Sequence, residues 1–184
     1  MSTDWSRDGR FVIFQTLDPT TGYDIWVLPL SGDRKPYAFL HSQSAEISGR
    51  SIMLPMWGKL SPDGRWLAYQ SNETGDNEIY AQAFPGKEGK WRVSVKGGTR
   101  PIWSGDGKEL FYIAADNKMM AVDVKSGARF EHGVPKPLFE ARMVPQSGFD
   151  VSPDGKRFLL VVPLEQAANP PMTVVVNWHA GVKR

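Results

Sequence analysis

Residues 60–69 read LSPDGRWLAY, in which Ser61-Pro62-Asp63-Gly64 comes just before an alternating run of apolar residues. Proline presets the negative φ of the second position of a type I turn. Aspartate tolerates the third position, and glycine accepts the left-handed backbone of the fourth. The phrase is therefore predicted to form the corner of a β-hairpin, as a three-residue loop with a bulge. Arg65–Gln70, which follow, have the composition of a strand.

The same phrase occurs four times along the chain. Its copies are Ser6-Arg7-Asp8-Gly9, Ser61-Pro62-Asp63-Gly64, Ser104-Gly105-Asp106-Gly107 and Ser152-Pro153-Asp154-Gly155. The aspartates are 55, 43 and 48 residues apart, and recurrence at such intervals is typical of a repeat architecture. We therefore interpret the corner residues as turn formers without a catalytic role. They are Asp8, Gly9, Asp63, Gly64, Asp106, Gly107, Asp154 and Gly155.

Each corner is flanked by further apolar runs that complete a unit of the repeat. In the second unit, for example, the runs after the corner strand are EIYAQAF at 78–84 and KWRVSV at 90–95. Four antiparallel strands per unit predict an all-β fold, a β-propeller of about four four-stranded blades that is half of a larger ring or a fragment of one. The alternative is a sandwich of about sixteen short strands, which gives no reason for the recurring corner. We expect a single domain over 1–184, with units at approximately 3–47, 56–98, 99–145 and 146–184.

The composition excludes several classes of protein. Hydrophobic residues make up 41% of the 184 residues and charged residues 23%, as in an ordinary globular domain. The net charge is +2 without a basic run, so neither nucleic acid nor a membrane surface is an expected partner. The absence of cysteine excludes disulfides and thiolate metal sites. There is no apolar signal-peptide region and no run approaching 18 apolar residues, so we expect a soluble chain without membrane insertion.

Two longer stretches carry a family resemblance. LSPDGRWLAYQSNETGDNEIYAQAF (60–84) and PIWSGDGKELFYIAADNKMMAVDV (101–124) resemble the WD-like repeats of TolB-type propellers. GGTRPIWSGDGKELFYI (97–113) and PPMTVVVNWHAGVKR (170–184) are similar to the C-terminal sensor propellers of some bacterial serine/threonine kinases. No kinase motif is present. The resemblance therefore implies a sensing part of a larger signalling protein, with a periplasmic or otherwise extracytoplasmic location.

The chain departs from this family in two places. The stretch 48–59 is extra and apolar, and we expect Met53, Leu54, Met56 and Trp57 to be covered, either in an inter-blade loop or by a partner. After Trp178 only six residues remain, so the fourth unit lacks an outer strand. Unpaired strand edges favour association. We therefore expect a two-fold dimer that completes an eight-bladed ring, or a truncated piece of a larger propeller.

The sequence contains little that would support catalysis. His41, His132 and His179 lie in different units without metal-ligand spacing. There is no Gly-x-Ser-x-Gly elbow, and the inner-strand segments supply only Asp4 and Asp150, too few for an autonomous lactonase or glycosidase. We therefore predict no enzyme, no metal and no cofactor. The predicted function is a ligand- or protein-binding or scaffolding propeller. The alternative is a propeller that gates a peptidase-type hydrolase domain supplied elsewhere.

Candidate binding residues lie where the chain enters the innermost strands. In propellers the loops around the channel mouth commonly bind ligands or partners. The residues best placed for this role are Arg50, Arg100 and Phe149, together with Trp57 from the extra stretch. The alternative is that these four side chains only line or plug the channel.

Overall fold

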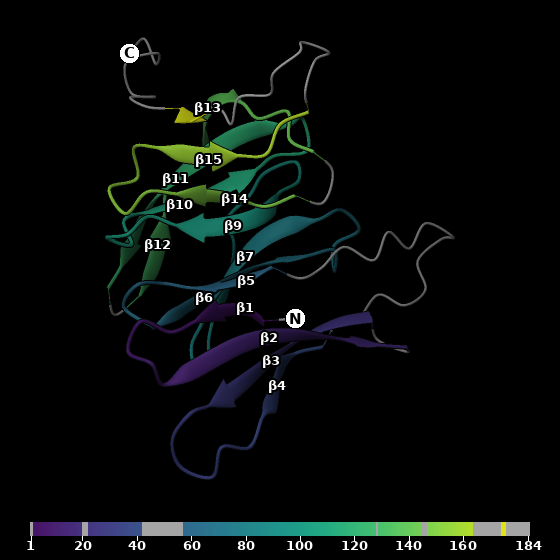
Figure 1. Ribbon diagram of the computed structural model, residues 1–184, viewed down its shortest axis with the longest axis vertical. Coiled ribbons are helices and arrows are strands. Elements are labelled where there is room, and N and C mark those ends of the chain that lie inside the picture. The colour runs from purple at the N-terminus through teal and green to yellow at the C-terminus, as the bar shows by residue number, and fades with distance from the viewer. Residues whose placement is uncertain are drawn as a thin grey trace.

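The computed structural model describes residues 2–19, 22–41, 57–127, 129–144, 147–163 and 174–175. These residues form strands and turns and no helix, and hence no helix that could cross a membrane. The strands make four antiparallel sheets in chain order (Figure 1). The first sheet contains β1 (Ser2–Trp5), β2 (Phe11–Asp18), β3 (Gly22–Pro29) and β4 (Tyr37–Leu40). The second contains β5 (Gly58–Leu60), β6 (Trp66–Ser71), β7 (Glu78–Ala83) and β8 (Lys90–Arg92). The third contains β9 (Thr99–Trp103), β10 (Glu109–Ile113), β11 (Lys118–Ser126), β12 (Phe130–His132) and β13 (Lys136–Glu140). The fourth contains β14 (Phe149–Val151), β15 (Phe158–Leu160) and β16 (Val174–Val175).

The sheets are the blades of a propeller. Their first strands contact one another in succession, β1 with β5, β5 with β9 and β9 with β14. In the first blade β2, β3 and β4 lie successively farther from these first strands (Figure 1), and the second blade has the same strand order. The predicted all-β propeller of about four blades is therefore confirmed. The third blade differs in detail, because β12 pairs with the end of β11 as a fifth strand while β13 pairs with its beginning.

Each pair of neighbouring blades encloses its own hydrophobic core. Between the first and second blades lie residues such as Ile13, Ile25, Leu67 and Tyr69. Trp66, Tyr112 and Phe130 lie between the second and third, and Phe111 and Phe158 between the third and fourth. The alternation of side chains along a strand explains this division, because successive residues of β6 and β10 face opposite neighbours. Tyr69 and Trp66 on β6, for instance, belong to different cores.

The four corners share one hydrogen-bond pattern. In the second blade Gly64 N–H donates to the Ser61 carbonyl (2.8 Å), and Ser61 N–H donates to the Trp66 carbonyl (2.8 Å). The Ser61 hydroxyl accepts from Trp66 N–H (3.0 Å) and donates to Asp63 Oδ1 (2.6 Å). Asp63 Oδ1 also accepts from Arg65 N–H (3.1 Å). The loop thus spans four residues, 62–65, and not the three that the sequence suggested. The Asp63 and Ser61 side chains accept from the N–H groups of Arg65 and Trp66, so Ser61 pairs with Trp66 and not with Arg65. The equivalent bonds recur from Ser6, Ser104 and Ser152.

Valine in place of Gly64 is expected to lower the free energy of unfolding by about 2 kcal/mol. Gly64 has φ +69°, and an added Cβ would meet nothing within 4 Å, so the cost is backbone strain and not a clash. Asparagine tolerates this backbone region, so Gly64→Asn should lose less than half as much. Urea denaturation of both variants measures the difference. Equal losses would show that the left-handed backbone is not the cause.

The corner hydrogen bonds also predict acid sensitivity. They lower the pKa of Asp8 from its ordinary 3.8 to about 2, chiefly through the Arg10 N–H, then the Ser6 hydroxyl and the Arg10 side chain. The folded state therefore binds fewer protons than the unfolded state in this range, and this contribution to stability is lost as pH falls from about 4 to 2. The urea midpoint of Asp8→Asn should fall less steeply over that range than that of the unmodified chain. Asp76→Asn, at an exposed aspartate outside the corners, is the control and should leave the slope unchanged.

Candidate functional site

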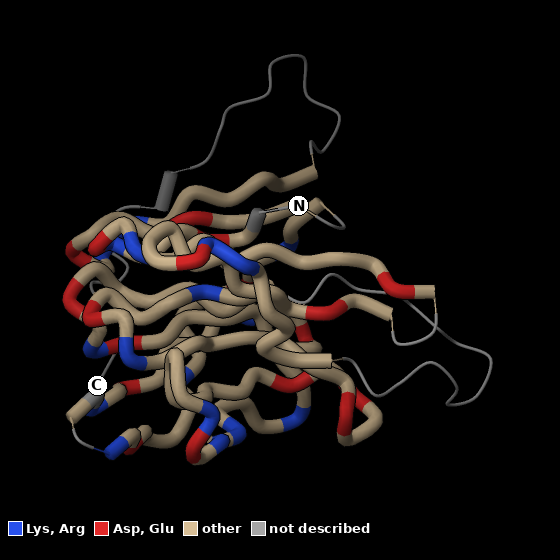
Figure 2. Tube along the Cα trace, turned by 90° about the horizontal axis from the view of Figure 1, so that it is seen from below, with Lys and Arg blue, Asp and Glu red and all other residues tan. Residues whose placement is uncertain are grey.

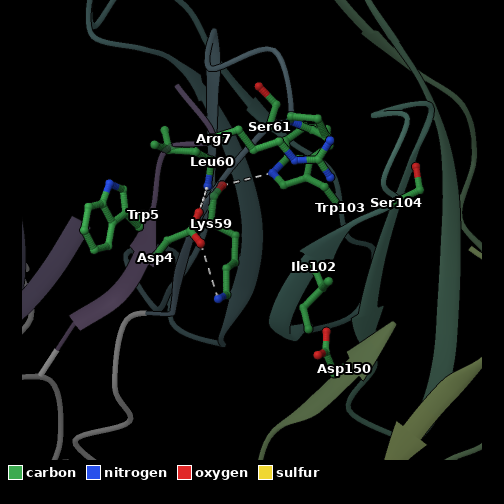
Figure 3. Close-up of a pocket in the computed structure, with 11 residues that line it drawn as sticks. Asp4, Trp5, Arg7, Lys59, Leu60, Ser61, Ile102, Trp103, Ser104 and Asp150 are labelled. Carbon is green, nitrogen blue, oxygen red and sulfur yellow. Dashed lines mark hydrogen bonds and ion pairs between the residues drawn. The ribbon is translucent and has the colours of Figure 1, made fainter. Parts of the chain in front are cut away.

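Two neighbouring cavities run along the first strands of the blades. The corner pocket, of about 220 Å³, lies beside the hairpin corners and is lined by Asp4, Lys59, Leu60, Ile102, Trp103 and Asp150, among others. Asp4 and Lys59, from β1 and β5, occupy one side of it, while Ile102 and Asp150, from β9 and β14, occupy the other (Figure 3). The Arg100 pocket, of about 230 Å³, lies at the beginnings of β5, β9 and β14 and shares Lys59, Ile102 and Asp150 with the corner pocket.

Polar contacts in the corner pocket join three blades. Asp4 Oδ2 accepts from Leu60 N–H (2.7 Å), and Asp4 Oδ1 lies 3.6 Å from Lys59 Nζ. Trp103 Nε1 donates to the Lys59 carbonyl (2.9 Å). Burial raises the pKa of Asp4, and the charge of Lys59 and the Leu60 N–H oppose this shift only in part. The carboxylate of Asp4 is therefore held by its neighbours in the fold and is already engaged with a cation.

The Arg100 pocket brings together three of the predicted channel-mouth residues. Trp57 precedes β5, Arg100 lies in β9, and Phe149 begins β14. All three line this one cavity. The indole of Trp57 extends toward the fourth blade. A Cβ atom added to Gly148, just before β14, would lie 3.9 Å from Cη2 of Trp57. The fourth predicted residue, Arg50, lies outside the described residues, as do Met53, Leu54 and Met56.

A bulge in β9 determines the position of Arg100. Phe111 pairs with Ile102 and Ile113 with Thr99, so Arg100 and Pro101 together oppose one residue of β10. Arg100 has φ +58°, which is uncommon for a residue other than glycine. Its backbone N–H donates to Gln70 Oε1 of the second blade (3.0 Å), and Pro101 has no N–H to pair. Bulges of this kind change the direction of a side chain relative to the regular strand.

Several pocket residues were not predicted as site residues from the sequence. Lys59 and Ile102 line both pockets, yet neither stands out in an ordinary strand sequence. Asp4 and Asp150 were noted only as scattered carboxylates, and the fold brings both to the same cavity. One usable signal for the bulge was present, since a proline inside a strand such as β9 is typical of bulges and edges.

The described residues do not present a metal site. No group of three or more histidine, cysteine, aspartate or glutamate residues lies together among them. His41 Nδ1 lies 3.0 Å from Asp24 Oδ2 within the first blade, and His132 Nδ1 lies 3.0 Å from the Gly133 carbonyl in the third. His179 is outside the described part of the chain. Along the described trace, basic and acidic residues are interspersed rather than gathered on one basic face (Figure 2).

Comparison with known proteins gives matches of structure and none of sequence. No family model matches the chain, and no curated protein matches it. The fold is similar to TolB from Acinetobacter baumannii, with a TM-score of 0.66 and 18% identity over 88% of this chain and 37% of TolB. It is also similar to a putative TolB from Agrobacterium tumefaciens (TM-score 0.59, 18% identity, 91% of this chain and 55% of that one). A putative 6-phosphogluconolactonase from Bacteroides uniformis gives a TM-score of 0.54 at 18% identity, over 93% of this chain and 54% of that one.

These similarities establish the fold, a TolB-like β-propeller. The chain spans between about a third and just over half of the length of the three solved structures. At 18% identity a shared fold does not imply a shared activity.

Proposed function

We propose that this chain is a non-catalytic binding propeller that takes a ligand or a protein partner along the first strands of its blades. The observation that carries the proposal is the Arg100 pocket, where a strained arginine, a tryptophan and a phenylalanine from three blades line one cavity. Strained backbone of this kind persists where the surrounding structure imposes it, and it clusters at ligand sites. In a cavity with aromatic walls and a few charged groups, those groups orient a bound ligand.

Within this proposal the chain is the sensor part of a larger signalling protein in an extracytoplasmic compartment. The support is the resemblance of residues 97–113 and 170–184 to kinase-linked sensor propellers. A binding module needs no catalytic group of its own. This agrees with Asp4 being engaged by Lys59 and by a backbone N–H.

Site-specific photo-crosslinking tests the proposal in cells of the encoding organism. A photoreactive phenylalanine analogue replaces Trp57 in the pocket or, as a control, Val134, which is 79% exposed between β12 and β13. A discrete crosslinked product is expected from position 57 and not from position 134. Products from both positions in equal amount, or from neither, would contradict binding at the pocket.

A lactonase assay tests the competing enzymatic function, since one similar structure is a putative 6-phosphogluconolactonase. We expect the purified chain to hydrolyse sugar lactones no faster than buffer does. Faster hydrolysis that is lost in Asp150→Asn would overturn the non-catalytic proposal. Asp76→Asn is the control in this assay, because Asp76 is exposed and lines neither pocket.

We also propose that two copies associate through their terminal blades to complete a ring. Ile13, Ile25 and Val27 of the first blade point into the core that it shares with the second blade. Phe14 and Trp26 alternate with them along β2 and β3 and therefore lie on the opposite face. These two rings stack with centroids 6.4 Å apart. Trp5, which pairs with Val12 of β2, is 63% exposed. On the fourth blade Leu159 is 43% exposed and Val161 52% exposed. In a two-fold ring the first blade of one copy would pack on the fourth blade of the other.

Light scattering measures this association directly. The unmodified chain is expected at about 41 kDa, twice the 20.5 kDa of one chain, at micromolar concentration. Trp26→Glu places a charge at a half-buried position on the outer face of the first blade and should give the single-chain mass with an unchanged circular dichroism spectrum. Lys35→Glu, in the exposed turn before β4, is the control and should keep the dimer. A stable mass of 20.5 kDa for the unmodified chain would exclude the dimer.

A further inference from the structure

The guanidinium of Arg100 lacks a partner within the described structure. Its Nε atom is buried and has no hydrogen-bond acceptor. No described carboxylate forms an ion pair with it. Burial lowers the pKa of Arg100, and no neighbouring charge opposes the shift. Arg100 is half-buried. Removing even part of a charged group from water without a counter-charge is unfavourable, so this arrangement is expected where a ligand supplies the counter-charge.

The other cation of the pocket is already neutralised. Lys59 lies 3.6 Å from Asp4 on the corner side. Asp150 lines both pockets, but its described hydrogen bond is from the Val151 N–H, and it forms no ion pair with Arg100. Arg100 is therefore the cation of this pocket that has no ion-pair partner among the described residues, and Asp150 adds a carboxylate to the same lining. A guanidinium presents its donors as a planar fork that matches the two oxygens of a carboxylate.

The walls beside Arg100 are apolar. Trp57, Pro101, Ile102 and Phe149 line the pocket together with Arg100, and the cavity of about 230 Å³ is smaller than an ordinary drug-sized site. A space of this size suits one aromatic or aliphatic group of about the bulk of an amino-acid side chain. The aromatic rings offer flat surfaces for such a group, while the arginine offers a hydrogen-bonding edge.

We infer that the Arg100 pocket binds a carboxylate carried by an aromatic or aliphatic group, with the guanidinium of Arg100 on the carboxylate and Trp57 and Phe149 on the apolar part. The inference rests on the proposed binding function and names the chemistry of its ligand. The same chemistry occurs in a free aryl or alkyl acid and in the C-terminal residue of a peptide. A peptide would extend from this pocket into the adjoining corner pocket, which shares Lys59, Ile102 and Asp150 with it.

Binding is tested by titration calorimetry on the full chain with phenylacetate and with phenylacetamide, its uncharged counterpart. Phenylacetate is expected to bind with a Kd of about 1 mM or tighter, and phenylacetamide at least tenfold more weakly. A second pair of probes is a hexapeptide that ends in phenylalanine and the same peptide with a C-terminal amide. Tighter binding of the acid peptide than of phenylacetate identifies a peptide terminus as the ligand, and equal affinities identify a small acid. Equal binding of the charged and uncharged probes, or no binding of either acid, overturns the inference.

Two glycine variants separate binding from folding. Arg100→Gly removes the guanidinium and relieves the left-handed strain at φ +58°, so it should raise the Tm while weakening phenylacetate at least tenfold. Lys96→Gly is the matched control, because Lys96 has φ +59° but is exposed and lines neither pocket. It should raise the Tm and leave the affinity unchanged. Wild-type affinity in Arg100→Gly would overturn the inference. The crosslinking result at position 57 would stand independently, so the proposed function can survive this failure.

Discussion

Alanine at Gly105 is expected to lower the free energy of unfolding by about 3 kcal/mol, although it adds only one methyl group. The new Cβ would lie 2.3 Å from the carbonyl oxygen of Pro153 and 2.8 Å from its Cα. These are backbone atoms of the next corner and cannot rotate away. Relief therefore requires the third and fourth blades to separate. That separation also strains the hydrogen bond from Gly105 N–H to the Pro153 carbonyl (3.1 Å).

Urea denaturation of Gly105→Ala beside Gly127→Ala measures this contact. A Cβ on Gly127 would meet its nearest atom, the Arg129 carbonyl oxygen, at 4.0 Å. The control variant is therefore expected to stay within about 0.5 kcal/mol of the unmodified chain. If both alanine variants unfold at the same denaturant concentration, the corners of the third and fourth blades are not in contact in solution.

Alanine at Trp66 is expected to cost about 3 to 5 kcal/mol, or a Tm roughly 10 °C lower. Trp66 is 6% exposed and lies in the core between the second and third blades. Its ring packs against Trp91 at a centroid distance of 5.4 Å and against Phe130 at 5.2 Å. Phe130 in turn lies 6.3 Å from Trp103. Truncation would leave a cavity in an aromatic cluster that joins two blades.

Phenylalanine at the same position separates packing from hydrogen bonding. The Nε1 atom of Trp66 is buried and has no acceptor among the described residues, so Trp66→Phe loses volume but none of the described hydrogen bonds. We expect it to cost less than half as much as Trp66→Ala in thermal denaturation. A loss as large as that of alanine would mean that the indole N–H makes a contact on which the blade interface depends.

The hairpin corners and the blades were predictable from the sequence because their causes are local. Ser61, Asp63 and Gly64 satisfy the backbone of their own hairpin within five residues of the chain, so the phrase has the same geometry in every blade. The apolar runs at 66–69 and 110–113 were predictable as strands because their composition alone favours that structure. The recurrence of the corner then indicated a propeller. The loop was nevertheless one residue longer than predicted, since the Asp63 carboxylate accepts from the Arg65 N–H and Ser61 pairs with Trp66 instead of Arg65.

The grouping of the candidate site residues depended on contacts between blades. Arg100 and Phe149 were chosen because each lies where the chain enters an inner strand, and Trp57 because it lies in the extra stretch. Their meeting in one cavity follows from the packing of three blades around the axis. The bulge that directs Arg100 depends on the register of β9 against β10 and on Gln70 of the second blade. Lys59 could not be chosen from the sequence, because its ion-pair partner Asp4 is more than fifty residues away in the chain and lies beside it only in the fold.

The second residue of each corner shows where local information ends. Two corners have proline there, Pro62 and Pro153, while the other two have Arg7 and Gly105. Proline follows from the turn itself, because it presets the backbone angle that this position requires. Glycine at 105 follows from a neighbour instead, because the backbone of Pro153 occupies the space that a side chain would need. The turn geometry was determined by the sequence alone, whereas the requirement for glycine at 105 arises only once the third and fourth blades are packed together.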